Sequence, residues 1–299
     1  MDELRKSVLL TSVRLAGAVL ILGGWSVAQA TEPCDDFDEC KVLIEINASD
    51  GDIGFHWLGD AGDLRAMRID DPFGDKIFEN KASGSLREQK LTETFGESAE
   101  PLCWEDPDAD PEDLDEVMTL REFRDLWIPG IYTFRGKGEE GEQLSGETML
   151  TYDLPAAPQE VDFEDGVISW EAGDDLGNCA PISDQGDDYA GQELIEDLVN
   201  DDIIADPAGV PVAAYEVVLE PDVEDGDPVG QLVFTVRVAW DIDPMEVTVP
   251  EDYLSALPDN TPVKVEIGAI GVDDNATFTE EDGFCVNEVD DGCEEEEDE

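Results

Sequence analysis

Net charge constrains this chain more than any other feature of its sequence. The 299 residues include 78 acidic side chains and only 16 lysines and arginines, which gives a formal net charge of −62 at pH 7. Self-repulsion at this level destabilises a compact state unless salt or divalent cations screen it. Apolar residues still make up 41% of the chain, which is enough for a hydrophobic core. We therefore expect a folded protein with a solvated acidic surface suited to saline surroundings, with dedicated Ca²⁺ binding as the alternative.

The same charge limits the partners. Binding to nucleic acid depends on neutralising phosphates with lysine and arginine, so nucleic acid is excluded as an ordinary partner. Anionic membrane surfaces are disfavoured for the same reason. A protein or a glycan remains as the expected partner, and the sequence does not say which.

The N-terminus has the pattern of a secretory signal peptide. A basic start precedes a short apolar stretch, and Ala28-Gln29-Ala30 then gives the small-x-small pattern that signal peptidase reads. The apolar stretch, Leu15–Gly24, is too short to span a bilayer as a helix. Residues 1–30 are thus predicted to be removed before Thr31, and no later segment is apolar enough for a transmembrane helix. We expect a periplasmic or secreted mature protein.

Cysteine usage agrees with export. All six cysteines lie in the predicted mature part: Cys34, Cys40, Cys103, Cys179, Cys285 and Cys293. An even number in an exported chain indicates up to three disulfides, although the pairing stays open. Since none of them forms a C-x-x-C pair, zinc and thioredoxin-like chemistry are poor interpretations.

The first half of the mature chain alternates apolar and polar residues in short runs, as β-strands do. After an acidic lead at 31–40, these runs predict a β-rich domain of unknown type over 41–154. The clearest hairpin is expected within 131–152, around a turn rich in Gly and Glu. A helix is expected from Asp110-Pro111, because a capping residue followed by proline is a typical helix start. The linker-like Leu154–Pro158 ends the domain.

The second half resembles a fibronectin type III domain over residues 155–287. The segment Leu257–Ile270 is similar to the one that enters strand F of that family, and Asn275–Thr279 would start strand G. Trp170 and Tyr215 match its strand-B tryptophan and strand-C tyrosine. The resemblance implies two antiparallel sheets with these aromatic residues between them.

Two departures from the family stand out. Val263 occupies the place of the tyrosine whose hydroxyl closes a corner in that family, and an acidic insertion at about 173–212 separates strands B and C. A short helix is expected in the insertion, at about 193–199, and residues 288–299 form an acidic tail. The predicted fold is mainly β, with two β-sandwich-like domains, the second fibronectin type III-like, and one or two short helices.

The whole chain also resembles a family of uncharacterised exported bacterial proteins. Three segments carry this resemblance: Asp50–His56, Glu97–Pro101 and Leu154–Pro158. The resemblance implies a domain organisation and no activity.

Catalytic chemistry has weak support in the sequence. His56 is the single histidine, and no G-x-S-x-G or H-E-x-x-H pattern accompanies it. A histidine in a strand between Phe55 and Trp57 is typically a packed or half-exposed side chain. A pair of carboxylates could support hydrolysis, but so many acidic residues make any one pair uninformative.

Calcium is the sharper hypothesis. Acidic residues recur in turn-like segments, and the weak candidate ligands are Asp50, Asp52, Asp106, Asp108, Asp225 and Asp227. The segment from Asp106 opens like an EF-hand loop, but Pro111 and Val117 stand where the turn glycine and the bidentate glutamate belong. Turns favour Asp and Gly in any case, so each cluster has a simple structural interpretation.

These observations favour an exported non-catalytic binding, interaction or structural protein that requires no cofactor. The alternative is a Ca²⁺-stabilised or Ca²⁺-dependent module, including a glycan-binding one. Four tryptophans that could form a sugar-stacking platform are more typical of a core: Trp57, Trp104, Trp127 and Trp240. The third hypothesis is a carboxylate-based hydrolase.

Overall fold

The computed structural model describes residues 34–104, 117–183, 193–224 and 226–289. The predicted signal peptide, Asp110-Pro111 and nearly all of the acidic tail lie outside these residues. The described chain is mainly β, with two sheets and a few short helices, which confirms the predicted fold class. None of the helices in the described segments is long and apolar enough to cross a membrane.

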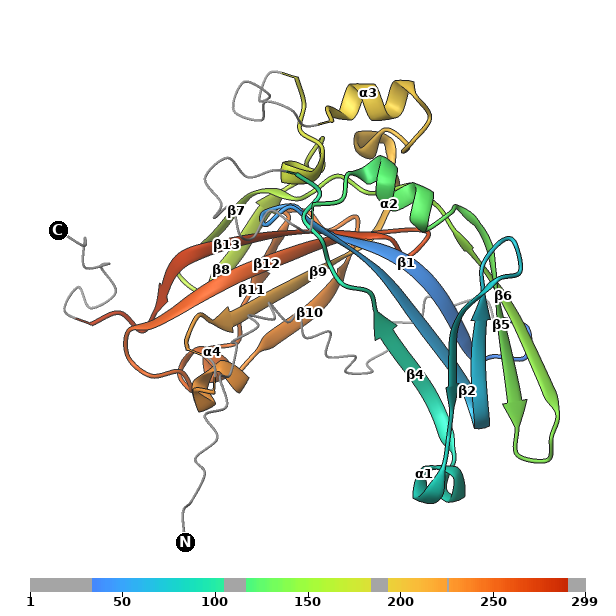
Figure 1. Ribbon diagram of the computed structural model, residues 1–299. Helices are drawn as coiled ribbons and strands as arrows, with labels where there is room; N and C mark the ends of the chain where they lie inside the picture. Colours follow the sequence, from blue (N-terminus) through green and yellow to red (C-terminus); the bar gives the residue numbers. More distant parts are fainter. Residues whose placement is uncertain (1–33, 105–116, 184–192, 225, 290–299) are drawn as a thin grey trace, which may run out of the picture. The chain divides into compact units, whose positions relative to one another are not determined.

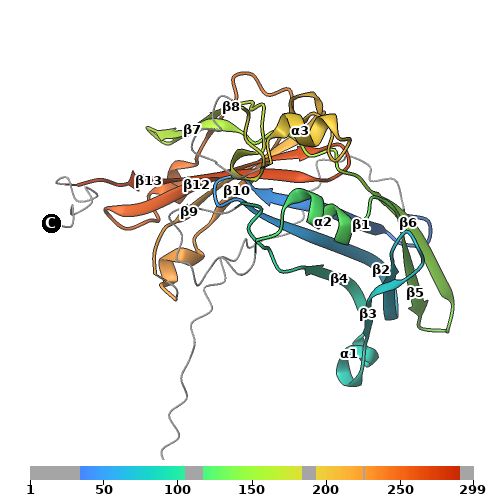
Figure 2. The ribbon, with the colours of Figure 1, turned by 45° about the horizontal axis from the view of Figure 1, so that its top comes forward.

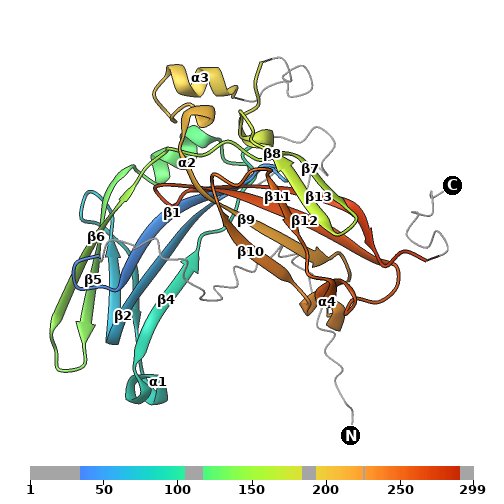
Figure 3. The same ribbon diagram turned by 180° about the vertical axis from the view of Figure 1, so that it is seen from behind.

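The main sheet has ten strands and contains segments from both halves of the chain (Figures 1 and 3). Its path runs in this order: β10 (Phe234–Ala239), β9 (Val212–Pro221), β12 (Thr261–Gly271), β13 (Ala276–Val286), β1 (Glu39–Asn47), β2 (Asp52–Asp70), β5 (Gly130–Gly138) and β6 (Gln143–Leu150). β3 (Lys76–Lys81) and β4 (Leu91–Glu97) also pair with β2. The second sheet consists of β11 (Glu246–Thr248), β8 (Val167–Glu171) and β7 (Gln159–Glu164).

The helices are short. Among the described residues they are α1 (Gly84–Gln89), α2 (Leu120–Leu126), α3 (Ile195–Asn200) and α4 (Glu251–Leu254). α2 begins after Thr119, whose hydroxyl accepts a hydrogen bond from the Glu122 backbone while the Glu122 side chain accepts one from the Thr119 backbone. This capping box satisfies two free N–H groups and fixes the start of the helix there. α3 confirms the helix expected in the acidic insertion.

Alternation along the strands divides the main sheet into an apolar and a polar face. In β1, Val42, Ile44 and Ile46 are buried in a hydrophobic cluster that extends through the first half of the chain. Leu43 and Glu45 between them, and Asn47 after them, point to the other face of the sheet. The polar face is therefore the one on which β1 can present charged side chains.

The second hydrophobic cluster contains residues of both sheets and lies in the second half of the chain. Figure 2 shows β7 and β8 above the part of the main sheet formed by β12 and β13. Trp170 of β8 and Tyr215 of β9 meet edge to face there, with ring centroids 5.4 Å apart. Val263, in the place of the corner tyrosine, is fully buried in the same cluster. The strands expected as B, C, F and G are β8, β9, β12 and β13.

The two halves share one sheet because β1 and β13 pair in parallel, with Glu45 opposite Ala276. The main sheet thus runs across the predicted boundary near residues 154 and 155. The acidic insertion also crosses it, because Leu176, Leu198 and Ile204 are buried in the first cluster.

Two disulfides link described residues of the chain. Cys34 pairs with Cys40 and Cys103 pairs with Cys179, with Cα atoms 5.7 and 5.1 Å apart. Cys285 is also disulfide-bonded, and Cys293 lies outside the described residues. The Cys103–Cys179 bond ties the segment that follows β4 to the acidic insertion.

Candidate metal centre

The polar face of the main sheet carries an unusual set of acidic side chains around the single histidine. The strand register places Gly54 of β2 and Ala276 of β13 directly opposite Glu45 of β1. His56 lies on the same face, two residues after Gly54, and is opposite Glu97 of β4. Four strands therefore contribute to one small area of the sheet.

Three of these side chains converge. One ligand atom from each of Glu45, His56 and Glu100 lies within 4.8 Å of the other two. The Nε2 atom of His56 is 3.3 Å from Oε1 of Glu100. The His56 ring is only 1% exposed, and its Nδ1 atom has no hydrogen-bond partner among the described residues. A buried imidazole nitrogen without a partner is costly unless a proton acceptor or a metal ion satisfies it.

A glycine makes room for the cluster. A Cβ atom on Gly54 would lie 2.8 Å from Nε2 of His56 and 2.9 Å from Oε1 of Glu100. Both distances are shorter than ordinary van der Waals contacts. The missing side chain at position 54 is what allows the imidazole and the carboxylate to approach over β2.

Glu100 belongs to no strand, but its segment is fixed on both sides. The Ser98 backbone donates to the carbonyl of Phe55 at 2.9 Å, and the Ile53 backbone donates to the carbonyl of Pro101 at 3.1 Å. Cys103 follows and is held by its disulfide to Cys179. Glu100 is thus positioned by β2 and by a covalent tie to the acidic insertion.

Burial and mutual repulsion hold protons on the carboxyl groups of this face. Burial raises the pKa of Glu45 to about 7, against the attraction of His56, and the nearby Glu100 adds to the increase. Burial, followed by the charges of Glu100 and Asp50, raises the pKa of Asp52 to about 7. Bringing a cation to these groups would replace protons that they would otherwise keep near neutral pH.

For His56, burial and the acidic neighbours shift the pKa in opposite directions. Burial alone would lower the pKa of its imidazole, but the hydrogen bond that the ring donates to Glu100 and the charge of Glu45 together raise it. In the absence of a metal ion, a proton shared between His56 and the two carboxylates is the simplest way to satisfy the cluster.

The acidic face continues across β13, β12 and β9. Glu266 of β12 lies opposite Glu280 of β13. Burial, followed by the charges of Glu45 and Glu280, raises the pKa of Glu266 to about 8. Lys264 pairs with Glu220 at 3.2 Å and with Glu280 at 2.7 Å, which leaves Glu266 as the carboxyl of this row without an ion pair among the described residues.

Three of the predicted calcium ligands, Asp50, Asp52 and Asp227, lie among the described residues. Asp50 accepts a hydrogen bond from the Asn47 side chain at 3.0 Å, and Asp227 caps the 3₁₀ helix η4 (Pro228–Gln231). Only Asp52 lies beside the cluster, as its electrostatic coupling to Glu100 and Glu45 shows. The remaining candidates, Asp106, Asp108 and Asp225, lie outside the described residues.

The tryptophans do not assemble a platform. Trp57, Trp104 and Trp127 pack against the first hydrophobic cluster, and Trp127 stacks on Phe55 with ring centroids 3.9 Å apart. Trp240 is 60% exposed. The expectation that these aromatic residues are mainly part of the core is met by the first three.

Comparison with known proteins adds little to this geometry. No family model matches the chain, and no curated protein matches it. Among solved structures, the chain is similar to the fibronectin(III)-like modules of CbhA from Clostridium thermocellum, with 6% identity and a TM-score of 0.26. That match covers 84% of this chain and 93% of the other. A likeness at this level says nothing about function.

Proposed function

We propose that this is an exported, non-catalytic binding protein whose main sheet holds a divalent cation at Glu45, His56 and Glu100. The observation that supports the site is the convergence of three ligand atoms within 4.8 Å, one of them on a fully buried histidine. The disulfides fit an oxidising compartment, in agreement with the predicted signal peptide.

The donor set favours a transition-metal ion over Ca²⁺. One imidazole and two carboxylates suit Zn²⁺ or Mn²⁺, whereas Ca²⁺ takes six to eight oxygen ligands. Three protein ligands also leave coordination positions open, as in sites that bind water or an external ligand. A carboxylate or hydroxyl of a protein or glycan partner could complete the shell, and this is the role that we propose for the ion.

The first test is thermal unfolding of residues 31–299 in EDTA and in the presence of Zn²⁺, Mn²⁺, Ca²⁺ or Mg²⁺, with NaCl at matched ionic strength. An ion that binds only the folded state adds about 2.7 kcal/mol of stability at a hundredfold excess over Kd. We expect Zn²⁺ or Mn²⁺ to raise the melting temperature well above the Mg²⁺ and NaCl controls, and the increase to disappear in H56Q. Equal increases with all salts would mean that the charge is only screened, and would refute the site.

A substitution at Gly54 tests the geometry. Gly54→Ala places a Cβ atom against both His56 and Glu100, so we expect at least a tenfold loss of metal affinity by calorimetric titration. Gly62→Ala on the same strand is the control, because a Cβ atom there meets nothing within 4 Å. Equal affinities of the two variants would show that the cluster does not bind the ion.

One observation favours a second function. A carboxyl whose pKa is raised to about 7, such as Glu45, can act as a general acid beside a second carboxylate, as in glycoside hydrolysis. Assays on aryl glycosides with the wild type and E45Q decide the point. Turnover that E45Q abolishes would establish the hydrolase and replace the non-catalytic proposal.

A further inference from the structure

A second charged surface lies farther along β2 and has the opposite sign. On the face of the sheet away from the core, Ala66 of β2 is flanked by Lys81 of β3 and Lys137 of β5. In the next row, Arg68 is opposite Arg135 of β5. These four cations come from three adjacent strands, and we call them the basic field.

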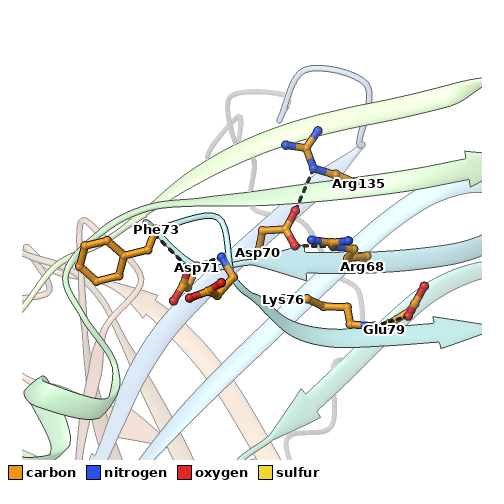
Figure 4. Close-up of polar contacts among 8 residues, drawn as sticks. Arg68, Asp70, Asp71, Phe73, Lys76, Glu79 and Arg135 are labelled. Atoms are coloured by element: carbon orange, nitrogen blue, oxygen red, sulfur yellow. Dashed lines mark hydrogen bonds and ion pairs between the residues drawn. The ribbon is translucent and has the colours of Figure 1, made fainter.

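The two arginines are fixed by a buried carboxylate (Figure 4). Like charges directly opposite each other in a sheet are destabilising. Asp70, only 4% exposed, offsets this repulsion by accepting from Nε of Arg68 and from Nε of Arg135, the latter at 2.9 Å. Because each arginine uses its Nε atom for Asp70, the terminal N–H groups of both guanidinium groups stay available for another acceptor.

The two lysines have no such partner. Both are exposed, and neither forms an ion pair within the part of the chain that the structure describes. The exposed carboxylate nearest in register, Glu79 opposite Arg68, forms its ion pair with Lys76 at 2.6 Å (Figure 4), and the charges of Arg68 and Lys81 make smaller contributions to lowering its pKa. Lysines without an ion pair among the described residues are unexpected in a chain with 78 acidic residues against 16 basic ones.

The next strand continues the pattern with neutral hydrogen-bonding residues. Gln143 and Ser145 of β6 lie opposite Lys137 and Arg135. On the β6 side the two residues in register with the basic field are therefore neutral, although the Asp36 carboxylate accepts a hydrogen bond from the Ser145 backbone at 3.0 Å.

We propose that the basic field binds an oxyanion of the sulfate or phosphate class, either free or as an ester group on a larger ligand. Neighbouring strands are about 4.8 Å apart, so the backbones of Lys81 and Lys137 are about 10 Å apart, with the small Ala66 between them. Two guanidinium forks and two ammonium groups suit a multiply charged oxyanion better than a single carboxylate. Repulsion by the rest of the protein is screened beyond about 8 Å at physiological ionic strength, whereas contact pairs persist.

Calorimetric titration with inorganic pyrophosphate and with a sulfated heparin disaccharide, each in 0.15 M NaCl, tests this inference. We expect at least one probe to bind, and the double variant K81Q/K137Q to lose at least tenfold in affinity. The control is K90Q/R237Q, which removes the same charge from two cations already paired with carboxylates. We expect less than a twofold change in the control.

The outcomes separate the sources of the anion. Binding of pyrophosphate alone would support a phosphate ligand, and binding of the disaccharide alone would support a sulfated glycan. Equal losses in the two double variants would show a response to net charge only and would overturn the proposal, as would the absence of binding by both probes. R135Q provides an independent variant, for which we also expect at least a tenfold loss.

Discussion

Replacing both Cys103 and Cys179 with alanine is expected to lower the free energy of unfolding by about 4 kcal/mol. The disulfide closes a long loop and so reduces the conformational entropy of the unfolded chain, and the variant regains that entropy. The two cysteines are separated by 76 residues. The bond also joins the segment after β4 to the acidic insertion, whose apolar residues cover the first hydrophobic cluster. Urea denaturation of the oxidised proteins at one pH, in EDTA, measures the loss.

The matched control is the double alanine variant of Cys34 and Cys40, which are also buried but only six residues apart. Its loss should be clearly smaller, since a short loop gains less from closure. The variant that lacks Cys103 and Cys179 should also bind Zn²⁺ or Mn²⁺ more weakly, because Glu100 lies three residues before Cys103. A greater loss from the short loop, or an unchanged metal affinity, would contradict this account of how Glu100 is held.

In the metal-free protein, stability is expected to fall as the pH rises from about 5 to about 9. The pKa of Glu266 is raised from 4.5 to about 8, and those of Glu45 and Asp52 are raised to about 7. Over this range the folded state binds more protons than the unfolded state, so the free energy of unfolding decreases with pH. The stabilisation is complete below the ordinary carboxyl pKa and is lost as the pH passes through 7 to 8.

The substitution Glu266→Gln isolates the contribution of this one carboxyl group to the pH dependence of stability. The groups that face Glu266 are Glu45, Glu280, Glu220 and the partly compensating Lys264. Glutamine keeps the shape of the side chain and removes its charge, so at pH 9 the variant should be more stable than the wild type by at least about 1 kcal/mol. This is less than the free energy that corresponds to the whole pKa shift of Glu266, because the carboxyl group is partly solvated. At pH 5 the two proteins should differ little.

Urea midpoints between pH 5 and pH 9 in EDTA measure this effect, and Glu246→Gln on the exposed side of β11 is the control. A shallower pH slope in E266Q alone is the expected result. Stability that is flat or rises with pH in the wild type would show that these carboxyl groups are solvated and ionised in the folded protein.

Local patterns in the sequence were sufficient for the elements and insufficient for the site. Alternation at Val42–Ile46 gave β1, and the Gly- and Glu-rich turn gave the β5–β6 hairpin. Both elements depend on neighbouring residues only, through the alternation of side chains along a strand and the chemistry of a turn. The register of the β1–β2 hairpin, which puts Glu45 opposite Gly54, is the signal that could have pointed to two members of the cluster.

The third member had no comparable signal. Glu100 lies in a segment outside any strand, and only tertiary hydrogen bonds bring it over β2. The parallel pairing of β1 with β13 joins residues more than two hundred positions apart, which no local pattern encodes. The predicted calcium ligands lie in segments with turn chemistry, and for Asp227 a capping role accounts for that chemistry.

A crystal of the oxidised mature protein, soaked in Zn²⁺ or Mn²⁺ and measured at the absorption edge of the metal, tests the central claim most directly. The account predicts one strong anomalous peak bound by Glu45, His56 and Glu100 at about 2.0–2.2 Å, the range for nitrogen and carboxylate ligands. That peak should be absent in H56Q crystals. Peaks only at exposed carboxylates, with none at His56, would contradict the proposed metal centre.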